Sequence, residues 1–177
     1  MKINLAKKIE PCVFTTYSEI EINFCKPKAE DILIEDIAHA LSNVPRYGGH
    51  TPKFYSVGQH SVLCSLRGKT YQEQLELLMH DASEAYMLDM PKPIKIMMPW
   101  YVEVEDNLMG VIFNKFKLTY PLTDEVHKID YELYLYEVSN FKNGFEFWDP
   151  EEAKVKFLAR FYELTRQIEN EQLTKKA

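Results

Sequence analysis

Glycine, cysteine and long apolar runs are all scarce in this chain of 177 residues. Its six glycines are few for a turn-rich all-β protein, which favours a helical architecture. Its three cysteines are an odd number without the spacing of a zinc site, which predicts reduced thiols in the cytoplasm. The stretch Met1–Glu10 is polar, and no window approaches the roughly 18 apolar residues of a membrane span. We therefore expect a cytoplasmic protein without a signal peptide and without a membrane partner.

An excess of basic charge is also missing. The formal net charge is −6, whereas a protein that binds nucleic-acid polymers generally needs a basic footprint to neutralise phosphates. A small anionic ligand is compatible with this charge, because a few local cations can hold it. A chain of this length should bury about 70% of its unfolded surface, so it needs neither disulfides nor a structural metal to fold.

Apolar residues at helical spacing predict an all-α fold, a compact bundle that follows a short extended or β arm. The arm spans residues 1–28 and contains an alternating stretch at Tyr17–Phe24. Residues 29–140 form the helical core, and residues 141–177 form a C-terminal helix whose polar tail should fray after Glu169. All 177 residues are expected to form a single domain.

Local signals delimit the expected helices. Pro45 ends the first helix, because proline cannot continue it. Ser56 and Gln59 form an S-x-x-Q pair in which each side chain can satisfy an amide of the first turn. Thr123 can cap a later helix, and Asp149, which precedes a proline, can cap the last one. The expected helices cover residues 29–44, 56–66, 71–87, 101–116, 124–140 and the stretch from 150 onward.

Polar side chains interrupt the apolar faces of three of these helices. A buried, unpaired charge costs several kcal/mol, so such residues need partners, and a metal ion is one good partner. The second, third and fifth expected helices each carry at least one of them. The residues concerned are His60, His80, Asp81, Glu84, Asp130 and, further along the same helix face, Glu137.

Two imidazoles and two carboxylates would make a mixed nitrogen and oxygen site. Such a site suits a borderline or moderately hard divalent ion such as Mn, Co, Fe, Ni or Zn better than Ca or an ion that prefers thiolates. Each residue also has a purely structural interpretation. A single histidine on an apolar face, such as His60, is more often a core residue with satisfied hydrogen bonds, and Asp130 could pair with a lysine or cap a neighbouring helix. The joint pattern is what favours a metal site.

The pattern H…HD…D, formed by His60, His80-Asp81 and Asp130, resembles the metal-binding signature of the HD-domain phosphohydrolases. The resemblance implies an HD-domain helical bundle. It also implies that these four residues bind one divalent metal ion, with Co, Mn, Zn, Fe, Ni and Mg as the candidates.

Three longer segments narrow the resemblance. They are Tyr55–Ser61 (YSVGQHS), His80–Glu84 (HDASE) and Asp89–Lys95 (DMPKPIK). All three are similar to segments of the bacterial 5′-deoxynucleotidases of the HD superfamily and of their phage-encoded relatives, which include small dATP triphosphohydrolases. The resemblance spans roughly residues 34–140, and neither end of the chain contributes to it.

The same resemblance implies roles for other residues. Glu84 matches the glutamate beside the attacked phosphate, as proton donor or water-orienting group, and Asp89 matches an aspartate at the pocket edge that contacts the sugar or orients the water. Arg46 and Lys95 match phosphate-binding cations. Tyr47 stands where the bacterial monophosphatases tend to have tryptophan, near the sugar or base. We interpret the further histidines, His50 and His127, as loop or surface residues.

The implied activity is hydrolysis of a 5′-deoxynucleoside monophosphate to deoxynucleoside and phosphate. Two alternatives are a deoxynucleoside triphosphate triphosphohydrolase of the dATP type and a non-catalytic nucleotide-sensing protein that keeps the fold. The resemblance also implies a homodimer or larger homo-oligomer, for which the aromatic residues Phe145, Phe147 and Trp148 are a candidate interface. A phage-encoded protein that acts in the host cytoplasm is consistent with these expectations.

Overall fold

A two-stranded hairpin opens the part of the chain, residues 12–176, that this computed structural model describes. Strands β1 (Val13–Thr15) and β2 (Glu21–Asn23) pair antiparallel, with Phe14 opposite Ile22. The side chain of Ile22 is fully buried, so the hairpin is anchored on the helical core. The remainder of the described chain is mostly helical, which confirms the predicted all-α class with a short β arm.

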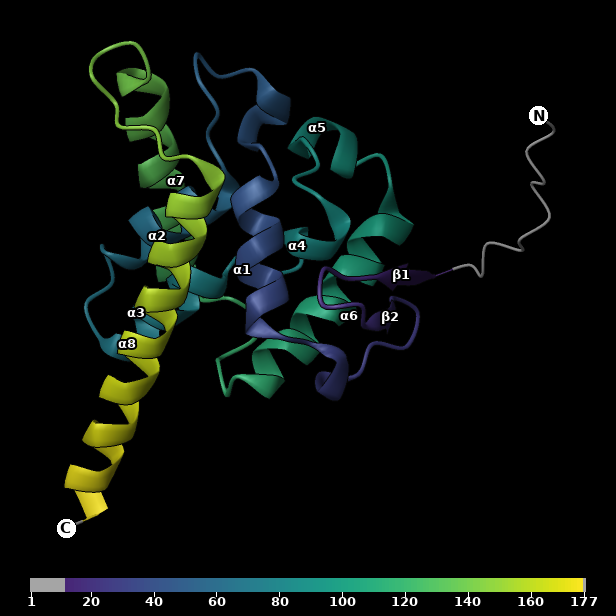
Figure 1. Cartoon of the computed structure of the whole chain (residues 1–177), viewed down its shortest axis with the longest axis vertical. Helices are drawn as coiled ribbons and strands as arrows, with labels where there is room; N and C mark the ends of the chain where they lie inside the picture. Colours follow the sequence, from purple (N-terminus) through teal and green to yellow (C-terminus); the bar gives the residue numbers. More distant parts are fainter. Residues whose placement is uncertain (1–11, 177) are drawn as a thin grey trace, which may run out of the picture.

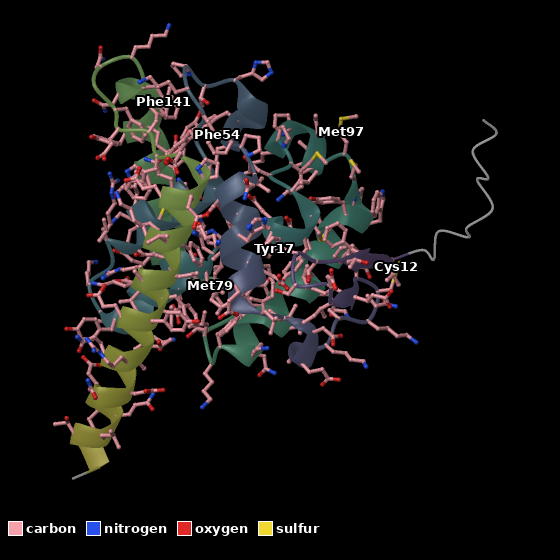
Figure 2. All side chains as sticks on the ribbon, viewed as in Figure 1. Cys12, Tyr17, Phe54, Met79, Met97 and Phe141 are labelled. Carbon is pink, nitrogen blue, oxygen red and sulfur yellow. A yellow bond between two sulfur atoms is a disulfide. The ribbon has the colours of Figure 1, made fainter. Side chains whose placement is uncertain are left out.

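Cys12 and Cys25 form a disulfide at the open end of this hairpin. The prediction of three reduced cysteines is therefore wrong for this pair. The disulfide forms because the strand pairing brings the residues flanking β1 and β2 opposite each other. In this pairing the Phe24 amide donates a hydrogen bond to the Cys12 carbonyl over 2.7 Å. Cys12 lies at the outer edge of the molecule, on the side of the hairpin (Figure 2). Cys64 is a free, buried thiol.

The helices enclose a core built mainly from four of them. Short 3₁₀ turns occur at Ala29–Asp31 and Arg46–Gly49. The helices are α1 (Ile34–Asn43), α2 (Val57–Ser65), α3 (Tyr71–Met79), α4 (Glu84–Met87), α5 (Lys92–Lys95), α6 (Pro99–Lys115), α7 (Asp124–Asn140) and α8 (Pro150–Lys176). Helix α8 lies along α1, α2 and α3 (Figure 1). The contact is apolar, because Leu41, Val57, Leu78 and Phe157, one from each of these helices, are fully buried.

The predicted helix over residues 71–87 is interrupted. Helix α3 ends at Met79, and four residues in a tighter turn separate it from α4. In that turn the Ala82 amide donates to the Met79 carbonyl and the Glu84 amide to the Asp81 carbonyl, each over 2.9 Å. These i→i+3 bonds replace the i→i+4 bonds of a continuous α-helix. The apolar period continues across the turn, so the sequence pattern does not reveal the interruption.

The predicted capping pair at the start of α2 is half correct. The Ser56 hydroxyl accepts a hydrogen bond from the Gln59 amide at 3.1 Å, as expected for an N-cap. The Gln59 side chain does not return to Ser56. It donates to the Glu146 carbonyl at 2.7 Å and accepts from the Trp148 amide at 3.0 Å. Gln59 therefore holds the segment between α7 and α8, a long-range contact that displaces the local one.

Helix α8 begins as predicted but extends further than expected. The Asp149 carboxylate accepts a hydrogen bond from the Glu152 amide at 2.8 Å, which caps the first turn. The expected fraying after Glu169 is wrong, because the helix continues to Lys176 and its C-terminal end projects beyond the other helices (Figure 1). Most residues of this last stretch, such as Glu171, Gln172 and Lys175, are good helix formers.

The aromatic residues named as a candidate interface pack within the chain. Trp148 is buried. Phe145 and Phe147 lie edge-on to the ring of Tyr55, with centroids 5.3 and 6.2 Å away, and Phe141 joins the cluster at the end of α7 (Figure 2). An oligomer formed through Trp148 is therefore not supported, and the oligomeric state stays a prediction. Among the described residues, no helix has the length and apolar character required to cross a bilayer.

The packing of α8 gives a first prediction. Phe157 is fully buried against the core, whereas Val155, two residues earlier, is 56% exposed. Phe157→Ala should lower the free energy of unfolding by about 3–5 kcal/mol, because it removes buried apolar contacts and leaves a cavity. Val155→Ala, the matched control on the same helix, should change it by less than about 0.5 kcal/mol. Urea denaturation followed by circular dichroism measures both; equal effects would show that α8 is not docked through Phe157.

Candidate functional site

Helices α2 and α7 and the turn between α3 and α4 bring the four predicted metal ligands together. His60 Nε2 lies 3.0 Å from Asp130 Oδ1 and 4.0 Å from Asp81 Oδ2. His80 Nε2 lies 3.2 Å from Asp81 Oδ2 and 3.6 Å from Asp130 Oδ1. The tight turn that interrupts the predicted helix allows the adjacent His80 and Asp81 to face the same point. The predicted cluster is therefore present as a geometric unit.

The hydrogen bonds of the two histidines leave their Nε2 atoms facing the carboxylates. His80 Nδ1 donates to the Leu77 carbonyl at 2.7 Å, which fixes the proton on Nδ1 because a carbonyl only accepts. His60 Nδ1 donates to Glu137 Oε1 at 2.6 Å. Among the described residues, the buried His80 Nε2 has no hydrogen-bond partner. Metal-binding histidines characteristically use one nitrogen for a carbonyl or carboxylate and the other for the ion, so both residues fit a divalent metal.

The carboxylates of the cluster also favour a positive charge at its centre. Burial acts to lower the pKa of His80, but the carboxylates of Asp81 and Asp130 raise it well above its ordinary value. Burial likewise acts to raise the pKa of Asp130, but the hydrogen bond with His60 and the nearby imidazole of His80 hold it far below its ordinary range. The arrangement thus favours positive charge between imidazole and carboxylate, and a proton or a divalent ion can supply it.

A fifth side chain, Cys64, lies in the same cluster of donor atoms. Cys64 lies one helical turn after His60 on α2, and its sulfur is 3.5 Å from His60 Nε2. One donor atom from each of His60, Cys64, His80 and Asp130 lies within 4.8 Å of every other. The sequence places Cys64 on the same face as His60, but nothing in the pattern distinguished it from a core residue.

Glu137 contacts the cluster through His60, on the Nδ1 side of the imidazole ring. It is fully buried on α7, two turns after Asp130, and besides the His60 bond it accepts hydrogen bonds from the hydroxyls of Tyr47, at 2.7 Å, and Tyr55. Burial acts to raise the pKa of Glu137, but the bond from His60 and the charge of Arg46 lower it below its ordinary value. Its spacing of seven residues from Asp130 was visible in the sequence, whereas its role as the carboxylate that orients His60 was not.

Arg46 reaches the cluster from the loop before α2. Its Nη1 atom lies 3.3 Å from Asp81 Oδ2, and its Nε lies 3.8 Å from Glu137 Oε2. Directly after Arg46 the loop turns through left-handed conformations at Tyr47, with φ 57°, and Gly48, with φ 59°. The predicted phosphate-binding arginine therefore lies beside the candidate metal ligands, where it pairs with the carboxylates of Asp81 and Glu137.

Glu84 and Lys95 lie on one side of the cluster. With His80 and Asp81 they line a cavity of about 380 Å³. Glu84 is buried, and within the described part of the chain its Oε2 atom has no hydrogen-bond partner. Burial raises the pKa of Glu84 well above its ordinary value, and the charges of Asp81 and Asp89 add to the rise. Lys95 donates to Glu105 at 2.8 Å, so its charge is partly balanced inside the cavity.

Asp89 and Tyr47 lie on the other side, in a larger cavity of about 800 Å³ that also reaches Arg46 and Asp130. Burial raises the pKa of Asp89. The Tyr47 hydroxyl is engaged with Glu137, so the part of Tyr47 that borders the cavity is its ring, which stacks on Tyr134 at 6.1 Å between centroids. The metal-ligand cluster is thus open on two sides.

The further histidines lie outside the cluster, as predicted. His50 is exposed and borders the larger cavity, and His127 is exposed and borders the smaller one. All nine predicted site residues line one of these cavities or belong to the cluster between them. The sequence did not identify Glu137 and Cys64 as members.

No protein-family model matches the chain. The chain is 44% identical over 103 residues to the uncharacterized protein YfdR of Escherichia coli K12, a match that covers 58% of this chain and 57% of that protein. It is 36% identical over 106 residues to the uncharacterized protein RCAP_rcc00048 of Rhodobacter capsulatus, over 55% of this chain and 54% of that protein. The chain therefore spans about half the length of the curated relatives it matches.

The contact between Glu137 and His60 gives a second prediction. Glu137→Gln should weaken metal binding by about 10–100-fold, because the amide no longer supplies the charge that orients and polarises the imidazole. Competition with a chromophoric zinc chelator measures this affinity, and circular dichroism verifies that the variant is folded. Glu132→Gln, an exposed position on the same helix, is the matched control and should leave the affinity unchanged. A folded Glu137→Gln protein with undiminished affinity would remove Glu137 from the site.

Proposed function

We propose that the protein is a metal-dependent phosphohydrolase that converts 5′-deoxynucleoside monophosphates into deoxynucleosides and phosphate. The observation that carries the proposal is the side-by-side position of a metal-ligand cluster and a buried glutamate, Glu84, without a partner for its Oε2 atom among the described residues. Both lie on a cavity wall, where a substrate can reach them. The choice of a deoxynucleotide rests on the resemblance described above.

The chain's own residues would divide the reaction between them. His60, His80, Asp81 and Asp130 would hold the ion, with Glu137 and the Leu77 carbonyl fixing the two imidazoles. A divalent ion bound there supplies Lewis-acid activation of water and of a phosphoryl oxygen.

Glu84 is suited to proton transfer. Its pKa is raised mainly by burial, while the charges of Arg46 and Lys95 act in the opposite direction. A buried carboxyl group with a raised pKa can hold a proton and deliver it to the 5′-oxygen that leaves from phosphorus. Glu84 lines the same cavity as His80 and Asp81, so this proton would lie close to a phosphate bound at the cluster.

The cations that face the cluster favour a single phosphate group. Arg46 can bind two phosphate oxygens at once, and the Lys95 ammonium has three donors, of which one contacts Glu105. Glu105 and Asp106 line the same cavity as Lys95 and add negative charge to its wall. A longer phosphate chain in this cavity would meet like charges, which disfavours the triphosphate alternative.

The larger cavity suits the nucleoside. Its wall includes the aromatic residues Tyr47, Tyr131 and Tyr134 beside the carboxylate of Asp89. Aromatic rings provide flat apolar faces for a base, and a carboxylate can accept hydrogen bonds from sugar hydroxyls. We therefore place the phosphate at the cluster and the sugar and base towards these tyrosines.

Product analysis tests the reaction. Metal-stripped protein should be incubated with Mn, Co, Mg or Zn and with deoxy- or ribonucleoside mono- and triphosphates, and the products separated by chromatography. We expect nucleoside and phosphate from the deoxynucleoside monophosphates, and little turnover of the ribonucleotides. Release of intact triphosphate from a deoxynucleoside triphosphate would replace the proposal with the triphosphohydrolase alternative. A bound ion with no turnover of any substrate would favour the sensing protein.

Replacing Glu84 tests its role as proton donor. Glu84→Gln should keep the metal affinity but lower kcat by roughly 10²–10⁴-fold, because an amide cannot donate the proton. Glu103→Gln, an exposed position on α6, is the control and should retain full activity. An unchanged kcat in Glu84→Gln would contradict this assignment, whereas loss of the ion would instead make Glu84 part of the metal site.

A further inference from the structure

Cys64 has no role in the proposed reaction, yet its thiol lies among the atoms that would hold the ion. The residue is fully buried and free of disulfides. It shares a face of α2 with His60, since residues four apart lie one above the other on a helix. Its sulfur is within 4.8 Å of donor atoms of His60, His80 and Asp130. A thiol in this position is either a small apolar residue of the core or a metal ligand.

The spacing of the donor atoms agrees with coordination by sulfur. Zinc binds histidine nitrogen at about 2.0–2.1 Å and cysteine sulfur at about 2.3 Å, so a nitrogen and a sulfur ligand separated by a near-tetrahedral angle lie roughly 3.5 Å apart. The distance between His60 Nε2 and Cys64 Sγ is 3.5 Å. Two further distances within the set, 3.0 Å from His60 Nε2 and 3.6 Å from His80 Nε2 to Asp130 Oδ1, are of the same order.

Asp81 differs from the other members because it has a competing partner. Its Oδ2 atom is 3.3 Å from Arg46 Nη1 and 4.0 Å from His60 Nε2. The guanidinium therefore shares the carboxylate oxygen that would bind the ion. Cys64, by contrast, has its closest polar contact inside the cluster.

We propose that the Cys64 thiolate is an additional direct ligand of the metal ion, beside the His60, His80, Asp81 and Asp130 ligands of the proposed function. The proposal rests on the metal site of the proposed function. A sulfur ligand changes which ion the protein selects, because thiolates prefer zinc, cobalt and iron, whereas magnesium and manganese prefer oxygen ligands. The site therefore selects a zinc-like ion and discriminates against magnesium.

Cobalt provides a direct readout of sulfur coordination. Binding of Co²⁺ to a thiolate produces a sulfur-to-cobalt charge-transfer absorption in the near ultraviolet, which nitrogen and oxygen ligands do not produce. Titration of the metal-free, full-length protein with Co²⁺ should give this band at one equivalent. Cys64→Ser should abolish the band while still binding cobalt through the remaining ligands.

The other two cysteines supply the matched control. The double variant Cys12→Ser/Cys25→Ser removes the remaining cysteine sulfur atoms from the chain and should retain the band in full.

In competition with a chelator, Cys64→Ser should weaken zinc binding by at least about tenfold and manganese binding much less, because only the softer ion gains from sulfur. X-ray absorption of the zinc-loaded wild-type protein should show a sulfur neighbour at about 2.3 Å, a result that needs no variant.

The failure of this proposal can be told apart from the failure of the proposed function. Stoichiometric cobalt binding and hydrolysis without a charge-transfer band, or a band that persists in Cys64→Ser, would overturn the ligand role of Cys64 alone. A zinc-loaded protein whose absorption spectrum shows only nitrogen and oxygen neighbours would do the same. Failure of the wild-type protein to bind cobalt or zinc would overturn both proposals.

Discussion

The hydrogen bond between His60 and Glu137 is the interaction on which the arrangement of the candidate site depends. It joins α2 to α7 inside the protein, where both side chains are fully buried. A buried carboxylate is costly unless its oxygens are hydrogen-bonded, and Glu137 meets this demand with His60, Tyr47 and Tyr55. The same contacts fix the orientation of the His60 ring, the course of the loop before α2 and the position of α7, which carries Asp130.

The negative charge gathered around this bond is the second constraint. Asp81, Glu84 and Asp130 all lie on or beside the same cluster, and Arg46 supplies the one permanent positive charge that contacts it directly in the described chain. Like charges in a partly buried space destabilise the fold unless a cation separates them. Such a gathering of like charges breaks the rule that buried charges are paired. Violations of this kind are characteristic of functional sites, because a purely structural core would avoid the energetic cost of the repulsion.

Much of the fold could be predicted because its signals are local. Pro45 ends α1, Thr123 caps α7 and Asp149 caps α8, each through contacts with neighbouring residues. The features that escaped prediction depend on distant partners. Gln59 binds the backbone 87 and 89 residues further along, and the bond between Cys12 and Cys25 follows from strand pairing.

The sequence by itself determined the helical class and the residues that need a polar or metallic partner, because the helical period shows which side chains share a face. It thereby identified His60, His80, Asp81 and Asp130. Only the tertiary structure decided that Cys64 lies beside them, that Glu137 orients the imidazole of His60, and that Arg46 pairs with the carboxylate of Asp81. The physical reason is that distances between faces of different helices depend on how the entire core packs, and no local pattern contains that information.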